Sequence, residues 1–143
     1  MPANGQSGLV IPVPAAGALL ASMQARYPGT ARPGLPAHVS LLYPFLASVE
    51  LDEQVIAALG ELLLEQAPMP VTFATCYRRG GFVALRPDPL EGLVGLISTE
   101  VAAMIEQEAS AALPIPAELQ EAYLMVFEQR WALRGRFAFH GGL

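Results

Sequence analysis

His38 and Ser40 are the residues whose types and spacing best suit chemistry on a bound ligand. They lie in the run Gly-Leu-Pro-Ala-His-Val-Ser-Leu-Leu-Tyr-Pro-Phe, which starts at Gly34 and is typical of a loop followed by a short β-strand. Side chains alternate between the two faces of a strand, so His38, Ser40 and Leu42 share one face. An imidazole and a hydroxyl placed two residues apart can reach the same ligand atom from one side. This strand is therefore the candidate site.

The opposite face of the same strand is expected to belong to the core. It carries Val39, Leu41, Tyr43 and Phe45, which are all apolar or aromatic. A simpler interpretation of His38 also stays open, in which its ring only bonds a loop carbonyl at the start of the strand. In that case the run is structural and carries no ligand.

Five further residues are weaker candidates for ligand contact: Tyr43, Arg78, Arg134, Arg136 and His140. Arg78 precedes a glycine pair and would grip a phosphate from a turn, or else sit in a solvated turn. Arg134 and Arg136 share a face of the last strand, either as a surface stripe or as an anion-lined cleft. Tyr43 alternates with the core set, and His140 lies close to the C-terminus. No pattern of metal ligands, glycine-rich phosphate loop or Ser-His-Asp triad is visible, so we expect no metal and no cofactor.

Composition narrows the class of protein. At 143 residues and 53% hydrophobic content, the chain is long and apolar enough for one domain with a substantial core. A net charge of −5 argues against an extended nucleic-acid surface, but a local cluster can still hold a small anion. No apolar run is long enough for a membrane span. The single cysteine, Cys76, favours a reducing cytoplasm, and the use of arginine for all eight basic residues suggests a GC-rich bacterial gene.

Hydrophobic periodicity and turn residues predict the elements that must position the site. Strands are expected over 8–13, 38–45, 71–77, 82–86, 122–127 and 131–139, and helices over 15–27, 51–66 and 90–113. We expect a single domain over 1–143, divided into a flexible end (1–7), a complete βαβαββ unit (8–87) and a long helix with a closing hairpin (88–143). Helices interleaved with hairpins predict an α+β sandwich.

The stretch from Leu9 to about Pro87 resembles the 2H phosphoesterase superfamily, specifically its 2′-5′ RNA ligase-like branch. The similarity is carried by Leu-Val-Ile-Pro-Val-Pro from Leu9, by Pro-Ala-His-Val-Ser-Leu-Leu-Tyr-Pro-Phe from Pro36, and by the helix and hairpin that follow. The tail from Glu121 to Arg134 is similar to the closing hairpin of that family.

This resemblance implies a two-lobed antiparallel sheet sandwich with flanking helices, in which each lobe supplies one His-x-Ser/Thr strand to a shared cleft. Family members typically hydrolyse 2′,3′-cyclic phosphates or related phosphodiesters without a metal. One histidine acts as base and the other as acid, while the two hydroxyls hold the phosphate. Carried onto this sequence, His38 and Ser40 match the first motif.

The second motif is absent from this sequence. The only other histidine is His140, and the nearest echo of the motif, Leu-Ile-Ser from Leu96, has leucine where histidine belongs. The second lobe is therefore expected to be abbreviated. His140 would complete a pair with His38 only if the last strand lay alongside the first motif.

Three functions remain open. The first is a 2H phosphodiesterase acting on a 2′,3′-cyclic phosphate or an RNA end, by hydrolysis or 2′-5′ ligation. The second is a degenerate pseudoenzyme that binds a small nucleotide or an RNA-end phosphate without turnover. The third is a protein-interaction module that keeps only the fold. Because an abbreviated lobe is liable to expose apolar surface, a homodimer is also expected.

Overall fold

The computed structural model of the chain describes residues 3–29, 31–79, 82–88, 92–96, 107, 111 and 113–140. The described strands form one antiparallel sheet of eight, in the order β6-β3-β4-β5-β2-β1-β7-β8. The strands are β1 (Ser7–Pro12), β2 (His38–Leu42), β3 (Met69–Arg79), β4 (Phe82–Asp88), β5 (Gly92–Leu96), β6 (Ile115–Leu119), β7 (Glu121–Phe127) and β8 (Trp131–Ala138). The helices are α1 (Gly17–Arg26) and α2 (Glu53–Leu64), preceded by the 3-10 turns η1 (Pro14–Ala16) and η2 (Ser48–Glu50). The predicted α+β class is confirmed.

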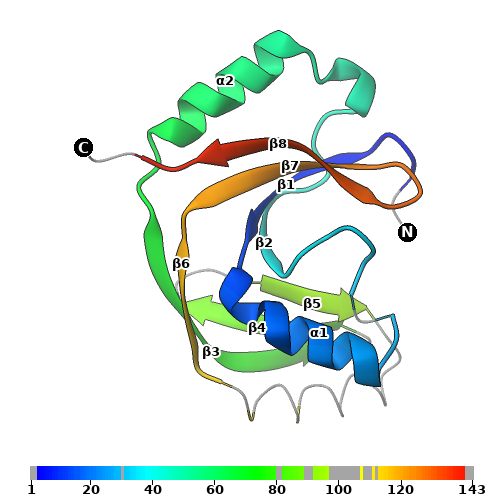
Figure 1. The fold of residues 1–143 in the computed structure, drawn as a ribbon, viewed down its shortest axis with the longest axis vertical. Coiled ribbons are helices and arrows are strands. Elements are labelled where there is room, and N and C mark those ends of the chain that lie inside the picture. The colour runs from blue at the N-terminus through cyan, green and yellow to red at the C-terminus, as the bar shows by residue number, and fades with distance from the viewer. Residues whose placement is uncertain are drawn as a thin grey trace.

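The sheet has two halves that meet at the pairing of β2 with β5. One half is β2-β1-β7-β8 and the other is β5-β4-β3-β6. At the junction, His38 lies opposite Leu93. Figure 1 shows α2 running along the first half beyond β8, and α1 at the level of the second half. The two predicted lobes are thus parts of one continuous sheet, and the candidate site lies on a strand at its centre.

Helix α2 is held firmly on the first half of the sheet. The side chain of Asp52 accepts a hydrogen bond from the backbone N–H of Val55 at 2.9 Å, which satisfies one of the free amides at the start of the helix. Leu59 and Leu63, four residues apart on one face, are both buried.

The described helices, α1 and α2, include none that is long and apolar enough to cross a membrane.

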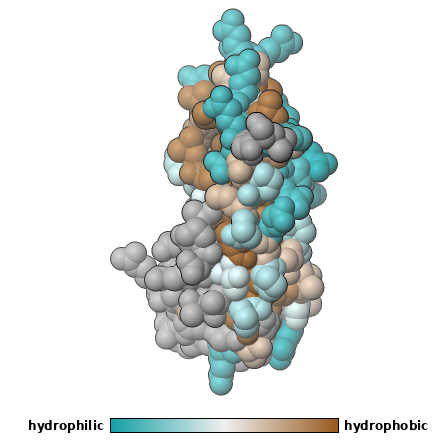
Figure 2. All heavy atoms as spheres, turned by 90° about the vertical axis from the view of Figure 1, so that its left-hand side faces the viewer, coloured by the Kyte–Doolittle hydropathy of each residue, from teal (hydrophilic) through white to brown (hydrophobic). Residues whose placement is uncertain are grey.

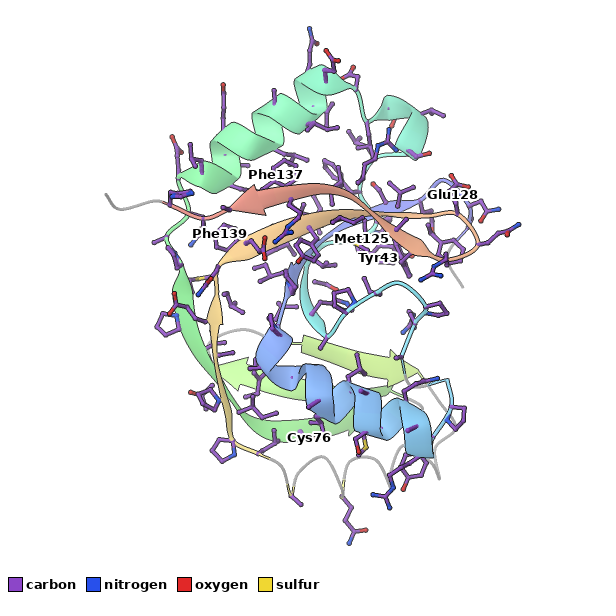
Figure 3. The ribbon with its side chains drawn as sticks, viewed as in Figure 1. Tyr43, Cys76, Met125, Glu128, Phe137 and Phe139 are labelled. Atoms are coloured by element: carbon purple, nitrogen blue, oxygen red, sulfur yellow. The ribbon has the colours of Figure 1, made fainter. Side chains whose placement is uncertain are left out.

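The first half of the sheet carries a buried apolar cluster on each of its faces. The main core cluster includes Leu9, Ile11 and Phe137, whereas the intervening Val10 belongs to a smaller cluster with Met125 and Trp131. Figure 3 shows Phe137 directed toward α2, while Met125 and Tyr43 lie on the other side of the sheet. Alternation along β1 therefore separates a thick core under α2 from a thinner apolar layer on the opposite face.

The predicted helix over 90–113 is wrong at its start. Gly92–Leu96 is strand β5, which pairs with both β4 and β2. Leu93 and Val94 are compatible with either a helix or a strand. The strand forms because it supplies hydrogen-bond partners for the backbone groups of the neighbouring strands β2 and β4. Of the remaining helix, Gln107 and Ala111 are helical, and the other residues from Ile97 onward to Ala112 lie outside the described part.

Two other boundaries differ from the sequence prediction. Strand β6 was not expected, because Pro114 and Pro116 read as helix stops, yet Ile115–Leu119 pairs with β3 as an edge strand. Part of the segment 1–7, which was expected to be flexible, is fixed: Ser7 is fully buried in β1, and Gly5 N–H donates to the carbonyl of Phe127 at 2.8 Å. The other predicted strands and helices are present with small shifts in their ends.

Candidate functional site

His38 and Ser40 lie on the same face of β2, as predicted. Their partners on β1 are Pro12 and Val10 respectively, and residues directly opposite each other in an antiparallel pair share a face. Val10 belongs to the smaller cluster with Met125 and Trp131, so His38 and Ser40 face the same side as that cluster. The site therefore opens on the side of the sheet that does not carry α2.

One hydrogen bond fixes the tautomer of His38. Its Nδ1 lies 2.8 Å from the carbonyl oxygen of Pro36. A carbonyl oxygen can only accept, so Nδ1 carries the hydrogen and Nε2 of the neutral ring keeps its lone pair. The simpler interpretation of His38 as a ring bonded to a loop carbonyl is thus correct for one nitrogen. It leaves the other nitrogen available to a ligand.

The surroundings of His38 lower its pKa below the ordinary value of 6.5. Burial of the ring is the largest cause, because a charged imidazolium loses its hydration there. The hydrogen bond to Pro36 opposes the shift, and the nearby positive charge of Arg32 adds to it. His38 is accordingly neutral at pH 7 and can act as a proton acceptor through Nε2.

Ser40 complements this acceptor with a hydroxyl that is available to a ligand. The residue is exposed, and its hydroxyl makes no hydrogen bond to another described residue. Consecutive residues on one face of a strand are about 7 Å apart. His38 and Ser40 can therefore touch two atoms of the same small group, one as an acceptor and one as a donor.

The loop before β2 is fixed at several points. At its start, Ala31 N–H donates to Gln24 Oε1 at 2.8 Å, and at its end Val13 N–H donates to the carbonyl of Ala37 at 2.8 Å. Between them, Trp131 N–H donates to the carbonyl of Pro33 at 3.0 Å. The entrance to the site is therefore anchored to α1, β1 and β8.

Gly34 is required at the centre of this loop. Its φ of +85° is a conformation that side chains disfavour, and an added Cβ would lie 1.8 Å from the carbonyl oxygen of Trp131. Only glycine lets the loop approach β8 this closely. The close approach fixes the loop that leads to His38.

Tyr43 does not belong to the main core, contrary to the prediction for the second face of β2. Leu41 falls at a shift in the register between β1 and β2, and the strand ends at Leu42, so the alternation does not continue. Leu41 and Tyr43 are 42% and 48% exposed, although Val39 is buried. The Tyr43 ring meets that of Trp131 edge-on at 5.8 Å, and its hydroxyl donates to Gln6 Oε1 at 3.2 Å. Tyr43 thus supports the smaller cluster beside the site.

The arginines of the last strand lie away from the site. β8 is separated from β2 by β1 and β7, which places Arg134 and Arg136 about 14 Å away at three strand spacings. Arg136 is engaged by Glu121 at 3.1 Å and lies over the Tyr123 ring at 5.4 Å. The Glu121 carboxylate raises the pKa of Arg136. This pair stabilises the closing hairpin and leaves Arg136 little freedom to bind a phosphate.

His140 and Arg78 are also distant from β2. His140 follows β8, and its backbone N–H donates to the carbonyl of Leu64 at 3.2 Å, at the end of α2. The last strand does not lie beside β2, so His140 does not pair with His38 within one chain. Arg78 is on β3, opposite Val83 and separated from β2 by β4 and β5, and its side chain lies outside the described part.

The strand beside the site offers no second acid or base. β5 pairs with β2 and has the sequence Gly-Leu-Val-Gly-Leu, in which no side chain titrates. The described residues thus bring together one imidazole and one hydroxyl at the junction of the two halves.

Sequence reasoning gave no role to Arg32 in the loop before β2. Its charge acts on His38 from the fixed loop, six residues before it. The signal available was an arginine in the Pro/Gly-rich run that leads to the motif. That signal carries no weight until the attachment of the loop to β8 is known.

The arrangement of strands and helices is a LigT-like α+β fold. Escherichia coli LigT solved in complex with ATP superimposes with a TM-score of 0.55 at 16% identity, covering 94% of this chain and 97% of LigT. The complexes of LigT with NADP+ and with phosphate give TM-scores of 0.53 and 0.50, at 16% and 17% identity. They cover 96% and 94% of this chain, and 99% and 97% of LigT.

A family model for the 2′-5′ RNA ligase superfamily matches residues 11–99. The chain belongs to the 2′-5′ RNA ligase superfamily, as the resemblance to 2H phosphoesterases predicted. None of the curated proteins compared with the chain matches it.

Proposed function

We propose that this protein binds a phosphate ester at His38 and Ser40, in the form of a 2′,3′-cyclic phosphate or the phosphate at an RNA end. Membership of the superfamily supports the class of ligand. LigT, which shares the fold, has been solved with ATP, NADP+ and phosphate. The observation that carries the proposal is the free Nε2 of His38 beside the exposed hydroxyl of Ser40 on one face of β2.

The two side chains divide the work on a cyclic phosphodiester. Ser40 donates its hydroxyl hydrogen to a non-bridging phosphate oxygen and holds the ligand. The neutral His38 accepts a proton through Nε2 from an attacking water, whose oxygen then forms a bond to phosphorus. As the ring takes this proton, its Nδ1–H bond to Pro36 holds it in place.

The leaving oxygen receives little help in this arrangement. When the bond from phosphorus to the ribose oxygen breaks, that oxygen needs a proton from the side opposite the attacking water. The sequence of β5 has no residue that can supply it, so in the proposed mechanism this proton comes from water. A positioned proton transfer is typically worth about 10²- to 10⁴-fold in rate. We therefore expect binding with turnover reduced by about that factor relative to a two-histidine site.

Binding and turnover of adenosine 2′,3′-cyclic monophosphate, measured without added metal, test the proposal. Wild-type protein should bind it, and His38→Ala and Ser40→Ala should each weaken binding about tenfold, as expected when one ligand hydrogen bond is lost. Any slow hydrolysis should disappear in His38→Ala. Failure of the wild-type protein to bind, at concentrations where its fold is intact, would refute the proposal.

Exposed apolar side chains support a second candidate, a module that docks another protein or a second copy of itself. Val49 is 92% exposed and Leu62 of α2 is 65% exposed. Figure 2 shows apolar surface beside polar surface at the height of α2. Light-scattering mass of the wild-type protein and of Leu62→Glu tests this: a dimer that the substitution dissociates supports it, whereas a monomer argues against self-association.

A further inference from the structure

Asn4 is the only asparagine of the chain, and it is followed directly by a glycine. In an asparagine–glycine pair, the backbone nitrogen of the glycine can attack the side-chain amide carbon of the asparagine. Glycine favours this reaction because it has no side chain to hinder the approach and its backbone turns easily. The Asn4 side chain also lies where water reaches it, since the residue is exposed. The pair is therefore chemically competent for deamidation.

The structure docks this pair onto the turn between β7 and β8. Gly5 N–H donates to the carbonyl of Phe127 at 2.8 Å, and Gln129 N–H donates to Asn4 Oδ1 at 2.8 Å. Figure 1 shows the start of β1 beside this turn. The two hydrogen bonds engage the two groups that would react, the attacking nitrogen and the amide that it attacks. Attack requires the Gly5 nitrogen to give up its hydrogen and to turn toward Cγ of Asn4, and the docked geometry opposes both.

Gly5 also connects this segment to the chain that follows β2. Gln6 N–H donates to the carbonyl of Ala3 at 3.1 Å, which closes a turn with Gly5 at a φ of +90°. Ser48 N–H, at the start of η2, donates to the carbonyl of Gly5 at 2.7 Å. A change in backbone length between Asn4 and Gly5 would therefore disturb contacts with the β7–β8 turn and with η2 together.

We propose that Asn4 is a deamidation site and that docking of residues 3–6 on the β7–β8 turn controls its rate. When the segment opens, the Gly5 nitrogen loses its proton and forms a bond to Cγ of Asn4, and the side-chain nitrogen leaves as ammonia. The product is a succinimide. Water then opens this ring at either of its two carbonyls and gives aspartate or isoaspartate. No electrons are gained or lost, and water is the only other reactant.

The two products differ in how they can dock. Aspartate keeps the backbone length and an oxygen that can accept the hydrogen bond from Gln129. In isoaspartate the backbone passes through the former side chain and is one methylene longer, so the bonds of Gly5 to Phe127 and Ser48 no longer fit together. Its free carboxylate also adds a negative charge near the turn that carries Glu128 (Figure 3). Isoaspartate at position 4 would therefore loosen the start of β1 from both neighbours.

Mass spectrometry of the full chain during incubation tests the control by docking. Cleavage after Arg26 releases the fragment 1–26, in which Asn4 is the only asparagine, so the mass increase from replacing the amide by a carboxyl reports this site. Opening of the segment breaks the three hydrogen bonds to Phe127, Gln129 and Ser48. The folded protein should therefore deamidate about 10- to 1,000-fold more slowly than the chain unfolded in urea. Equal rates would overturn the control by docking, and no product in urea would overturn the site itself.

Ser48→Pro weakens the docking in the folded protein. It removes the N–H that bonds Gly5, and proline is tolerated because Ser48 is the first residue of η2. We expect deamidation about tenfold faster than in the wild type. Ser48→Ala keeps the N–H and is the matched control, with an unchanged rate. A wild-type rate in Ser48→Pro, at an unchanged melting temperature, would contradict the proposal.

The melting temperature separates the two products. Protein that contains isoaspartate at position 4, isolated after incubation, should melt at a lower temperature than the wild type. Asn4→Asp has the same added charge without the extra methylene, so it should melt close to the wild type. Equal melting temperatures of the isoaspartate form and Asn4→Asp would show that backbone length at this position does not matter, and would overturn the structural consequence.

Discussion

β2 and β5 are neighbours at the centre of one sheet, yet their sequences differ in chemistry. β2 carries an imidazole and a hydroxyl on one face. β5 pairs with it directly but has only glycine and aliphatic residues. Both strands complete the hydrogen bonding of the sheet, so the backbone requirement is met equally well by either sequence. The sheet therefore constrains the backbone of both strands and leaves their side chains at this junction free to differ.

The consequence of this difference is an asymmetric site. A cyclic phosphate bound at the proposed site would meet an acceptor and a donor on the β2 side, whereas the sequence of β5 offers no acid or base on the other side. Binding requires only the first side. Efficient cleavage requires proton transfers on both sides of the phosphorus, so the comparison between β2 and β5 predicts a site that binds better than it reacts.

A proton donor added to β5 should give the largest change in turnover, because β5 has none in its own sequence. Leu93 lies directly opposite His38, and opposite residues in an antiparallel pair share a face. Leu93→His should therefore place a second imidazole near the leaving oxygen and raise turnover of adenosine 2′,3′-cyclic monophosphate by about 10²- to 10⁴-fold. Initial rates without added metal measure the effect.

Leu93→Gln is the matched control, because it is polar but cannot transfer a proton. It should leave the rate at the wild-type level, and His38→Ala should abolish the gain in Leu93→His. A rate unaffected by Leu93→His in a folded protein would mean that the position opposite His38 is not where the leaving group lies.

The loop before β2 requires glycine at position 34, and a substitution there tests the loop separately from the side chains of the site. Gly34→Ala places a methyl group against the Trp131 carbonyl and strains a positive φ, so the loop must move. We expect a loss of roughly 2 kcal/mol or more in the free energy of unfolding, together with weaker ligand binding. Denaturant unfolding provides the measurement.

Gly29 provides a comparison for the strain alone. Its φ is +97°, but a Cβ there would meet no atom within 4 Å. Gly29→Ala should therefore cost about 1 kcal/mol and leave binding intact. Equal losses at the two glycines would show that the contact of the loop with Trp131 does not matter.

The sequence predicts the fold and the first half of the site because both depend on local patterns. The alternation around His38 and Ser40 identifies the strand and its polar face, and the apolar stripe of α2 identifies the helix. β5 escapes prediction because Leu93 and Val94 suit either a strand or a helix, and pairing with two neighbouring strands decides. A sequence window of a few residues does not show which strands will pair in the folded protein.

The same reasoning explains which site residues were missed or misjudged. The need for glycine at position 34 becomes visible only through the contact of its loop with Trp131, which is far away along the chain. Arg136 looked available on the last strand but is paired with Glu121 across the hairpin. Its sequence pattern showed a shared face with Arg134 and could not show the partner.

The pH dependence of the free energy of unfolding tests whether the pKa of His38 is lowered in the folded protein. The pKa of His38 is lowered in the folded protein, so between that value and 6.5 the unfolded chain binds more protons. The free energy of unfolding should therefore increase with pH through this window and level off above it. The wild type should lose stability as the pH falls below 6.5, relative to His38→Gln, as measured by denaturant unfolding at each pH. A parallel pH dependence in the two proteins would contradict this.

Ser40→Ala should have the smallest effect on stability and therefore separates binding from folding most cleanly. Its side chain is exposed and has no partner among the described residues, so the free energy of unfolding should change by less than about 0.5 kcal/mol. Binding of adenosine 2′,3′-cyclic monophosphate should nevertheless weaken about tenfold. Val39→Ala, one residue away on the buried face, should show the reverse: a loss of stability of about 1 to 3 kcal/mol and little change in affinity. If both substitutions affected stability and binding alike, the two faces of β2 would not have the separate roles that the comparison assigns to them.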